Sequence, residues 1–151
     1  MIRDQIKAAQ VEAMKARDSS RVQAIRLIQA ALKNRDIEAR TGQAPASDDV
    51  LVTEVLGKMV KQRRESITMY RQGGREELAA AEEAEVAVIE SFLPKQMDEE
   101  EAGAAIDAIV AEVGASSVKD MGRVMALVKE RHAGAMDISK ASALVRTRLA
   151  V

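Results

Sequence analysis

Apolar residues recur every three or four positions along most of this chain, which is the period of an amphipathic α-helix. In the first segment the apolar stripe consists of Ile2, Ile6, Ala9, Ala13 and Ala16. The pattern predicts helices at about 2–17, 21–40, 50–72 and 75–91, followed by three shorter helices within 98–149. Turn residues such as Gly73-Gly74 separate these segments. The sequence therefore predicts an all-α protein.

Capping signals refine the predicted helix ends. Ser20 followed by Gln23 fits a capping box that would open the second helix. Ser117 is placed to cap the sixth helix, and Gly42 and Gly114 are candidate stops. Each of these positions fixes a predicted helix end to within a few residues.

A domain boundary is predicted at Phe92-Leu93-Pro94, because the residue before a proline is driven out of helical geometry. Residues 1–93 would form an N-terminal helical domain of about four helices. Residues 94–151 would form a C-terminal three-helix bundle. The 151 residues suffice for one domain or two small helical ones. Aromatic residues make up only 1% of the chain, so aliphatic side chains must build both cores.

Charge is distributed unevenly, although the net charge is −1. Residues 1–75 carry 15 basic and 9 acidic side chains, residues 76–115 carry 1 and 12, and residues 116–151 carry 7 and 3. This layout predicts either internal pairing of charges or two basic surfaces separated by an acidic one.

The residues needed for several kinds of chemistry are missing from the sequence. It has no cysteine, so thiolate metal sites and cysteine nucleophiles are excluded. His132 is the sole histidine and is expected at a helix end, on the surface. Phosphate-binding motifs such as Gly-x-x-x-x-Gly-Lys are also absent. We therefore predict no catalytic residue, no metal and no cofactor.

Basic residues on two predicted helices are the candidate RNA contacts. In the third helix Lys61, Arg64 and Arg71 share one arc beside the apolar face. The tail candidates are Lys119, Arg123, Lys129 and Arg131. With so few aromatic residues, contacts to RNA would be made to the backbone or by arginine planes.

Structural ion pairs are the alternative use of these charges. Arg63 lies inside the apolar face of the third helix, where an unpaired charge is costly. The acidic fourth segment is its nearest source of carboxylates. The predicted set of ion-pairing residues is Arg63, Arg75, Glu82 and Glu85.

Several short strings, taken together, resemble the YqeY-like proteins of the GatB/YqeY family. They are Arg26-Leu27, Ala30-Ala31-Leu32-Lys33-Asn34, Lys61-Gln62-Arg63, Gly74-Arg75, Phe92-Leu93-Pro94-Lys95-Gln96, Asp120-Met121-Gly122-Arg123-Val124-Met125 and Ile138-Ser139. The resemblance implies a helical N-terminal domain and a tail shared with the B subunit of Asp/Glu-tRNA amidotransferases. In that enzyme the tail is associated with gripping tRNA, and the chemistry lies in a larger domain that this chain lacks.

The sequence departs from the family pattern after Gly134, where Ala135-Met136 stands in place of a basic residue.

Gly122, inside a predicted helix, has two explanations. Either it allows close helix packing, or it gives an RNA backbone access to the helix.

These observations lead to a prediction of function with alternatives. The leading prediction is a non-catalytic module that binds tRNA or aminoacyl-tRNA. The alternatives are an adaptor for a translation-related protein, and a carbon–nitrogen ligase activity with glutamine as amido donor within a larger complex. Membranes and DNA are not among the expected partners. With no membrane span or secretory leader in the pattern, a cytoplasmic protein is expected.

Overall fold

The computed structural model describes residues 1–42, 44–45, 47–132 and 134–150. The regular secondary structure of these residues is entirely helical. The helices are α1 Ile2–Lys15, α2 Ser19–Thr41, α3 Asp48–Gln72, α4 Glu76–Glu90, α5 Glu99–Val113, α6 Met121–His132 and α7 Ile138–Leu149, with a 3₁₀ turn, η1, at Val118–Asp120. No strand occurs among the described residues, so the predicted all-α class is confirmed. The chain divides into two compact units, Met1–Leu93 and Pro94–Val151.

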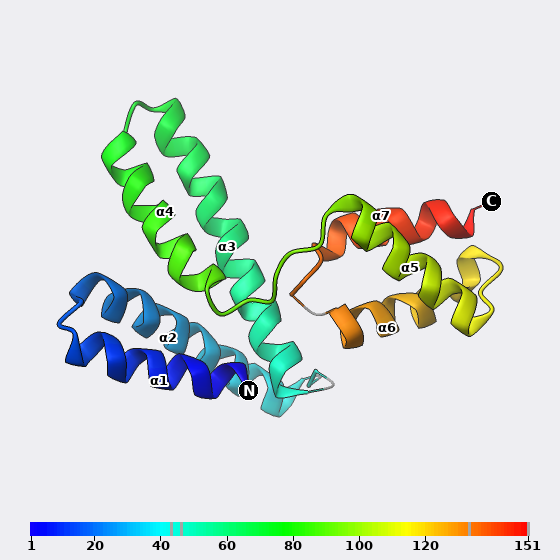
Figure 1. Ribbon diagram of the computed structural model, residues 1–151, viewed down its shortest axis with the longest axis horizontal. Helices are drawn as coiled ribbons and strands as arrows, with labels where there is room; N and C mark the ends of the chain where they lie inside the picture. Colours follow the sequence, from blue (N-terminus) through cyan, green and yellow to red (C-terminus); the bar gives the residue numbers. More distant parts are fainter. Residues whose placement is uncertain (43, 46, 133, 151) are drawn as a thin grey trace. The chain divides into compact units, whose positions relative to one another are not determined.

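The first unit is built around the antiparallel pair α1 and α2, which packs against the first half of α3 and the end of α4 (Figure 1). Its core is aliphatic except for one ring. The core consists of Ile6, Ala9, Ala13, Ile25, Ile28, Leu32, Leu51, Val52, Val55, Leu56, Met59, Ile89 and Phe92. Fully burying a side chain of this kind stabilises the fold by about 1.5–3 kcal/mol, so this cluster holds four helices together.

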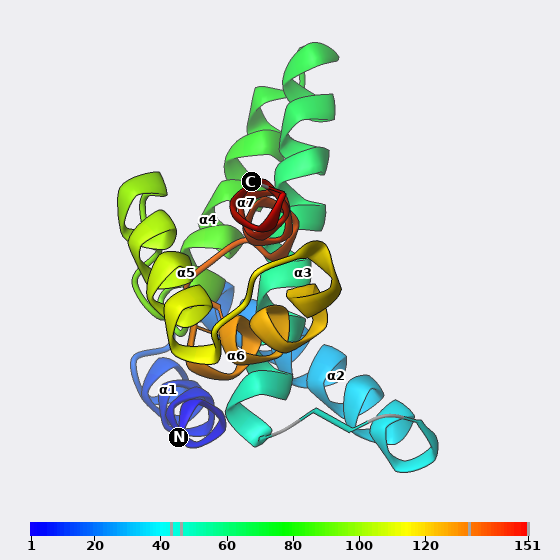
Figure 2. The same ribbon diagram turned by 90° about the vertical axis from the view of Figure 1, so that its right-hand side faces the viewer.

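The second half of α3 continues beyond this core and pairs with α4 alone (Figure 2). A narrow apolar seam joins the two helices, with Ile67, Ala79 and Val86 buried and Val60 and Tyr70 packed against them. A seam this narrow leaves the charged residues on its flanks to contribute to the pairing.

The second unit is a three-helix bundle of α5, α6 and α7. Its core consists of Ala102, Ile106, Ile109, Val124, Val128, Met136, Ala141, Val145 and Leu149. Ala135 and Met136, which stand where the resemblance led us to expect a basic residue, are both buried. The Ala135 carbonyl accepts a hydrogen bond from the Met97 amide at 2.9 Å. A charged side chain at either position would therefore meet the core rather than solvent.

Local signals at the helix ends differ from the predictions at three places. The second helix is capped by Asp18, which accepts a hydrogen bond from the Arg21 amide at 3.1 Å, and not by Ser20. Gly42 is extended rather than left-handed. Ser117 and Asp120 form a capping box around η1, one turn before α6 begins. Gly114 is left-handed with φ 65°, as its role as a helix stop requires.

Arg17 has φ 56°, in the left-handed region that disfavours a Cβ. The Asp18 amide bonds to the Ala13 carbonyl across this residue, which closes a Schellman motif. Arg17→Gly should therefore raise the free energy of unfolding by about 0.5–1 kcal/mol in urea titrations. Arg21→Gly, within the first turn of α2, serves as the control and should lower it by about 1 kcal/mol. Equal losses in both variants would contradict the assignment of strain to Arg17.

Candidate nucleic-acid interface

Arg63 of α3 lies against the acidic face of α4. Its Nε donates to Glu85 at 2.9 Å and lies 3.9 Å from Glu82. The Arg63 side chain is only 17% exposed. A guanidinium so poorly hydrated needs these carboxylates, so the pairing couples α3 to α4 along one flank of the apolar seam.

Arg64 and Arg71 occupy the opposite flank of the seam. Arg71 contacts Glu83 at 2.6 Å and Glu76 at 3.4 Å, and Arg64 pairs with Glu90. Hydrogen bonds to Glu83, and then to Glu76, raise the pKa of the Arg71 guanidinium. Seven-residue spacing places the two arginines in register with their glutamates. Two of the three α3 residues predicted to contact RNA are thus engaged within the unit.

Lys61 and Arg75 complete the set predicted on α3 and α4. Both are exposed, and within the described residues neither has an ion-pair partner. Arg75 is the N-cap residue of α4, next to Glu76 and Glu77. Adjacent residues do not face one another on a helix, which explains why the ion pair predicted for Arg75 is not observed.

The tail candidates lie on η1 and α6. Arg131 makes a bidentate pair with Glu112 of α5, at 2.5 and 2.7 Å, and these hydrogen bonds lower the pKa of Glu112. Arg123 donates to Asp120 at 3.2 Å. Lys119 and Lys129 are exposed and have no ion-pair partner among the described residues. Among the four tail candidates, the two lysines are therefore the ones whose charge is not compensated by a carboxylate of the described residues.

Asp120 organises the start of α6. Its carboxylate accepts hydrogen bonds from the amides of Ser116 at 3.0 Å and Ser117 at 3.4 Å. The Ser116 bond, followed by the Ser117 bond and the charge of Arg123, lowers the pKa of Asp120. This carboxylate orders the η1 turn that carries Lys119.

Gly122 is exposed on α6, and a Cβ built on it would meet no atom within 4 Å. The packing explanation for this glycine is therefore wrong. Gly103 of α5, which the sequence did not single out, is the buried glycine, with Arg148 Nη2 3.0 Å from its would-be Cβ. The surface around Gly122 is open to a ligand.

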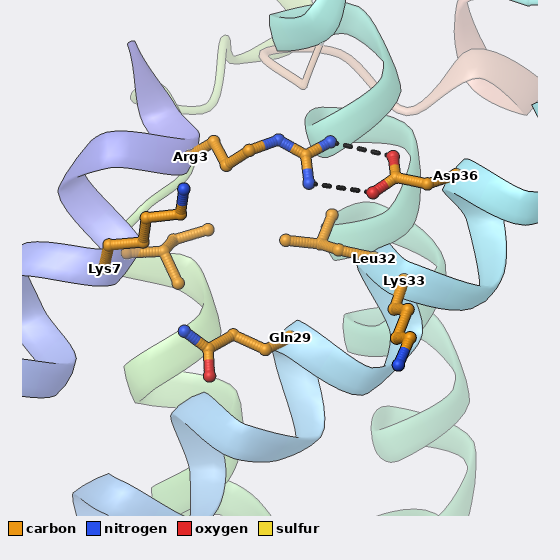
Figure 3. A pocket seen from close by; sticks show the side chains of 7 residues that line it. Arg3, Lys7, Gln29, Leu32, Lys33 and Asp36 are labelled. Atoms are coloured by element: carbon orange, nitrogen blue, oxygen red, sulfur yellow. Dashed lines mark hydrogen bonds and ion pairs between the residues drawn. The ribbon is translucent and has the colours of Figure 1, made fainter.

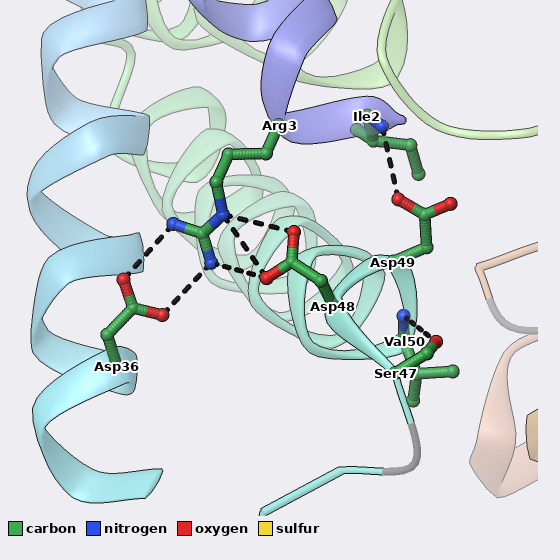
Figure 4. A network of polar contacts seen from close by, with 7 residues as sticks. All are labelled: Ile2, Arg3, Asp36, Ser47, Asp48, Asp49 and Val50. Atoms are coloured by element: carbon green, nitrogen blue, oxygen red, sulfur yellow. Dashed lines mark hydrogen bonds and ion pairs between the residues drawn. The ribbon is translucent and has the colours of Figure 1, made fainter. Parts of the chain in front are cut away.

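The strongest polar network of the first unit was not predicted from the sequence. Figure 4 shows Arg3 of α1 between Asp36 of α2 and Asp48 of α3. Its Nη2 lies 2.9 Å from a carboxylate oxygen of each. Asp49 accepts from the Ile2 amide at 3.1 Å, and Ser47 caps α3. The network joins three helices at the chain's start.

Metal chemistry has no visible site in the described part of the chain. His132 is half-buried at the end of α6, and no group of three or more His, Asp or Glu side chains there could hold a metal ion.

The fold defines the chain as an all-helical protein of two units, in which the arginines of α3 and α6 pair with carboxylates of the same unit. A family described as Yqey-like protein matches residues 3–149. The chain belongs to this family.

Curated relatives include a protein of Eremothecium gossypii named "Altered inheritance of mitochondria protein 41, mitochondrial". It is 32% identical over 82 residues, which cover 54% of this chain and 43% of the relative. The protein of that name from Clavispora lusitaniae is 35% identical over 92 residues, which cover 59% and 51%. The chain spans about half the length of the curated relatives it matches.

The predicted cytoplasmic location is contradicted by these relatives, because their names describe them as mitochondrial proteins. In the described residues no helix is long and apolar enough to cross a bilayer. Hydropathy distinguishes lipid from water, but it does not distinguish one aqueous compartment from another. That is why the prediction from composition failed.

Proposed function

We propose that this YqeY-like chain is a non-catalytic module that binds tRNA or aminoacyl-tRNA, accessory to amidotransfer carried out by other proteins. The observation that carries the proposal is the open face of α6. Gly122, Ala126 and Lys129 follow one another at four and three residues, so they share one face of the helix, and all three are exposed. Lys119 precedes this face in η1.

This face suits a phosphate backbone for two reasons. Small residues allow a strand to approach the helix closely, and the flanking lysines can neutralise phosphates at its edges. Lysine binds phosphate as a compact point charge without needing a fixed geometry. The resemblance of the tail to the tRNA-associated tail of the amidotransferase B subunit supports tRNA as the ligand.

Arg123 and Arg131 contribute less to binding under this proposal. Each would have to exchange a carboxylate, Asp120 or Glu112, for a phosphate, which offsets part of the gain. The proposal therefore assigns the main contacts to Lys119 and Lys129, and a positioning role to the two arginines.

The adaptor alternative is weakened by the structure of α4. Every glutamate of this helix except Glu77 pairs with an arginine of α3. Reversing the charge of Glu82 or Glu85 would thus disturb the α3–α4 pairing before it affected a partner.

Lys119→Gln/Lys129→Gln should weaken binding of bulk tRNA by about tenfold in fluorescence anisotropy at about 50 mM salt, and should lower the slope of log K against log salt by about 1.5. The matched control is Lys140→Gln/Arg146→Gln on α7, which removes the same charge from exposed positions of the same unit. The control should change the affinity by less than threefold. Equal losses in the two variants would show that net charge and not the α6 face determines binding, and would overturn the proposal.

A further inference from the structure

A pocket of about 210 Å³ opens between α1 and α2. Its apolar lining is Ile6 and Leu32, which are 1% and 3% exposed. Figure 3 shows Lys7 of α1 and Lys33 of α2 on opposite sides of this pocket, with the Arg3–Asp36 pair at one end. The pocket is smaller than the roughly 300–1,000 Å³ typical of organic ligands. It therefore fits a single small group.

The charges around the pocket favour an anion. Asp36 is its one lining carboxylate, and Arg3 binds it through two hydrogen bonds of 2.9 and 3.1 Å. Asp48, which is not part of the lining, also binds Arg3 at 2.9 Å, and the hydrogen bonds from Arg3 are the main cause that lowers the pKa of Asp48. Neither Lys7 nor Lys33 forms an ion pair in the described part of the chain. The cationic excess at the rim is thus open to a ligand.

Further basic residues of α2 lie on both sides of Lys33 along the helix. Arg26, Lys33 and Arg40 are spaced seven residues apart, which places them on one face of the helix at intervals of about 10.5 Å. All three are exposed, and no ion pair to any of them occurs within the described residues. In contrast, carboxylates of α4 and α5 neutralise most of the arginines of α3 and α6.

We infer that the pocket binds a phosphate group between Lys7 and Lys33, and that Arg26 and Arg40 bind further phosphates of the same RNA strand. Lysine ammonium groups on flexible stems suit a phosphate, whose oxygens accept hydrogen bonds from several directions. RNA as the source of the phosphate rests on the proposed function, whereas the pocket itself rests on its own geometry.

The test has two arms and uses the whole chain. In the first, inorganic phosphate is titrated into the labelled protein in phosphate-free buffer, and amide shifts are followed by NMR. The largest shifts are expected at residues 3–7 and 29–36, and Lys7→Gln/Lys33→Gln should abolish them. The control Lys15→Gln/Lys58→Gln removes two other exposed lysines of the same unit and should leave them intact.

In the second arm the same variants are titrated with bulk tRNA. Lys7→Gln/Lys33→Gln should weaken binding by about three- to tenfold and lower the salt slope by about 1–2, and the control should do neither. Amide shifts on phosphate titration that spread to lysines throughout the chain, or that persist in Lys7→Gln/Lys33→Gln, would overturn the inference. Shifts confined to the pocket with no tRNA binding by the wild type would support the pocket and overturn both RNA as its ligand and the proposed function.

Discussion

Replacing Arg3 with methionine should lower the free energy of unfolding by about 2 kcal/mol. Arg3 donates to Asp36 from Nη1 and Nη2 and to Asp48 from Nε and Nη2, and its side chain is only 25% exposed. Methionine retains most of the apolar stem but leaves the two carboxylates without a shared cation. The loss should therefore exceed that of an ordinary surface pair, which is worth about 0–1 kcal/mol.

Urea titration of Arg3→Met beside Arg26→Met measures this effect. Arg26 is exposed on α2 and has no ion pair among the described residues, so its replacement should change stability by less than about 0.5 kcal/mol. A loss in Arg3→Met no larger than in Arg26→Met would show that the network contributes nothing beyond its surface charge.

The effect of Arg3 should also depend on pH in a definite direction. Hydrogen bonds from Arg3 lower the pKa of Asp48. A carboxyl with a lowered folded-state pKa contributes its full stability above its unfolded pKa, at about 4, and loses it as the pH falls through the folded value. The difference between wild type and Arg3→Met should therefore be constant near neutral pH and should shrink below about pH 4.

Replacing Arg63 with methionine should cost about 1–2 kcal/mol, whereas the same change at its neighbour Arg64 should cost less than about 0.5 kcal/mol. Arg63 is 17% exposed and holds Glu85 and Glu82, while Arg64 is 59% exposed. Without Arg63 the two partly buried glutamates would lose their counter-ion beside the α3–α4 seam.

Thermal unfolding of the two variants side by side tests this contrast, because both remove one arginine from one helix. A third variant, Arg63→Met/Glu85→Gln, should recover part of the loss, since it removes the carboxylate that was left unpaired. Similar losses at Arg63 and Arg64 would contradict the distinction drawn from their exposure.

Helical periodicity predicted the fold class and part of the charge pairing. Arg63 falls within the apolar face of its helix by spacing alone, and that position required a carboxylate partner in the structure. The sequence did not show whether Arg64 and Arg71 contact RNA or form ion pairs within the fold, because their pairing depends on how α3 and α4 are aligned against each other. Seven-residue spacing of the α4 glutamates was the available signal, and it becomes informative only when the antiparallel register is known.

The network at Arg3 and the role of Gly122 were beyond the reach of sequence patterns. Arg3 meets Asp48 across 45 positions of the chain, a distance that no local rule covers. Gly122 is equally compatible with close packing and with an open surface until its neighbours are placed. The pocket beside Lys7 and Lys33 was missed for the same reason, since its walls come from two helices.

The affinity of the wild-type chain for bulk tRNA, measured by fluorescence anisotropy from about 50 to 200 mM salt, tests the central claim most directly. The proposal expects dissociation constants of about 1–100 µM at the lowest salt, and a steady weakening as salt rises. Absence of binding at the lowest salt, where any accessible cationic face should attract a polyanion, would contradict the assignment of this YqeY-like chain as an RNA-binding module.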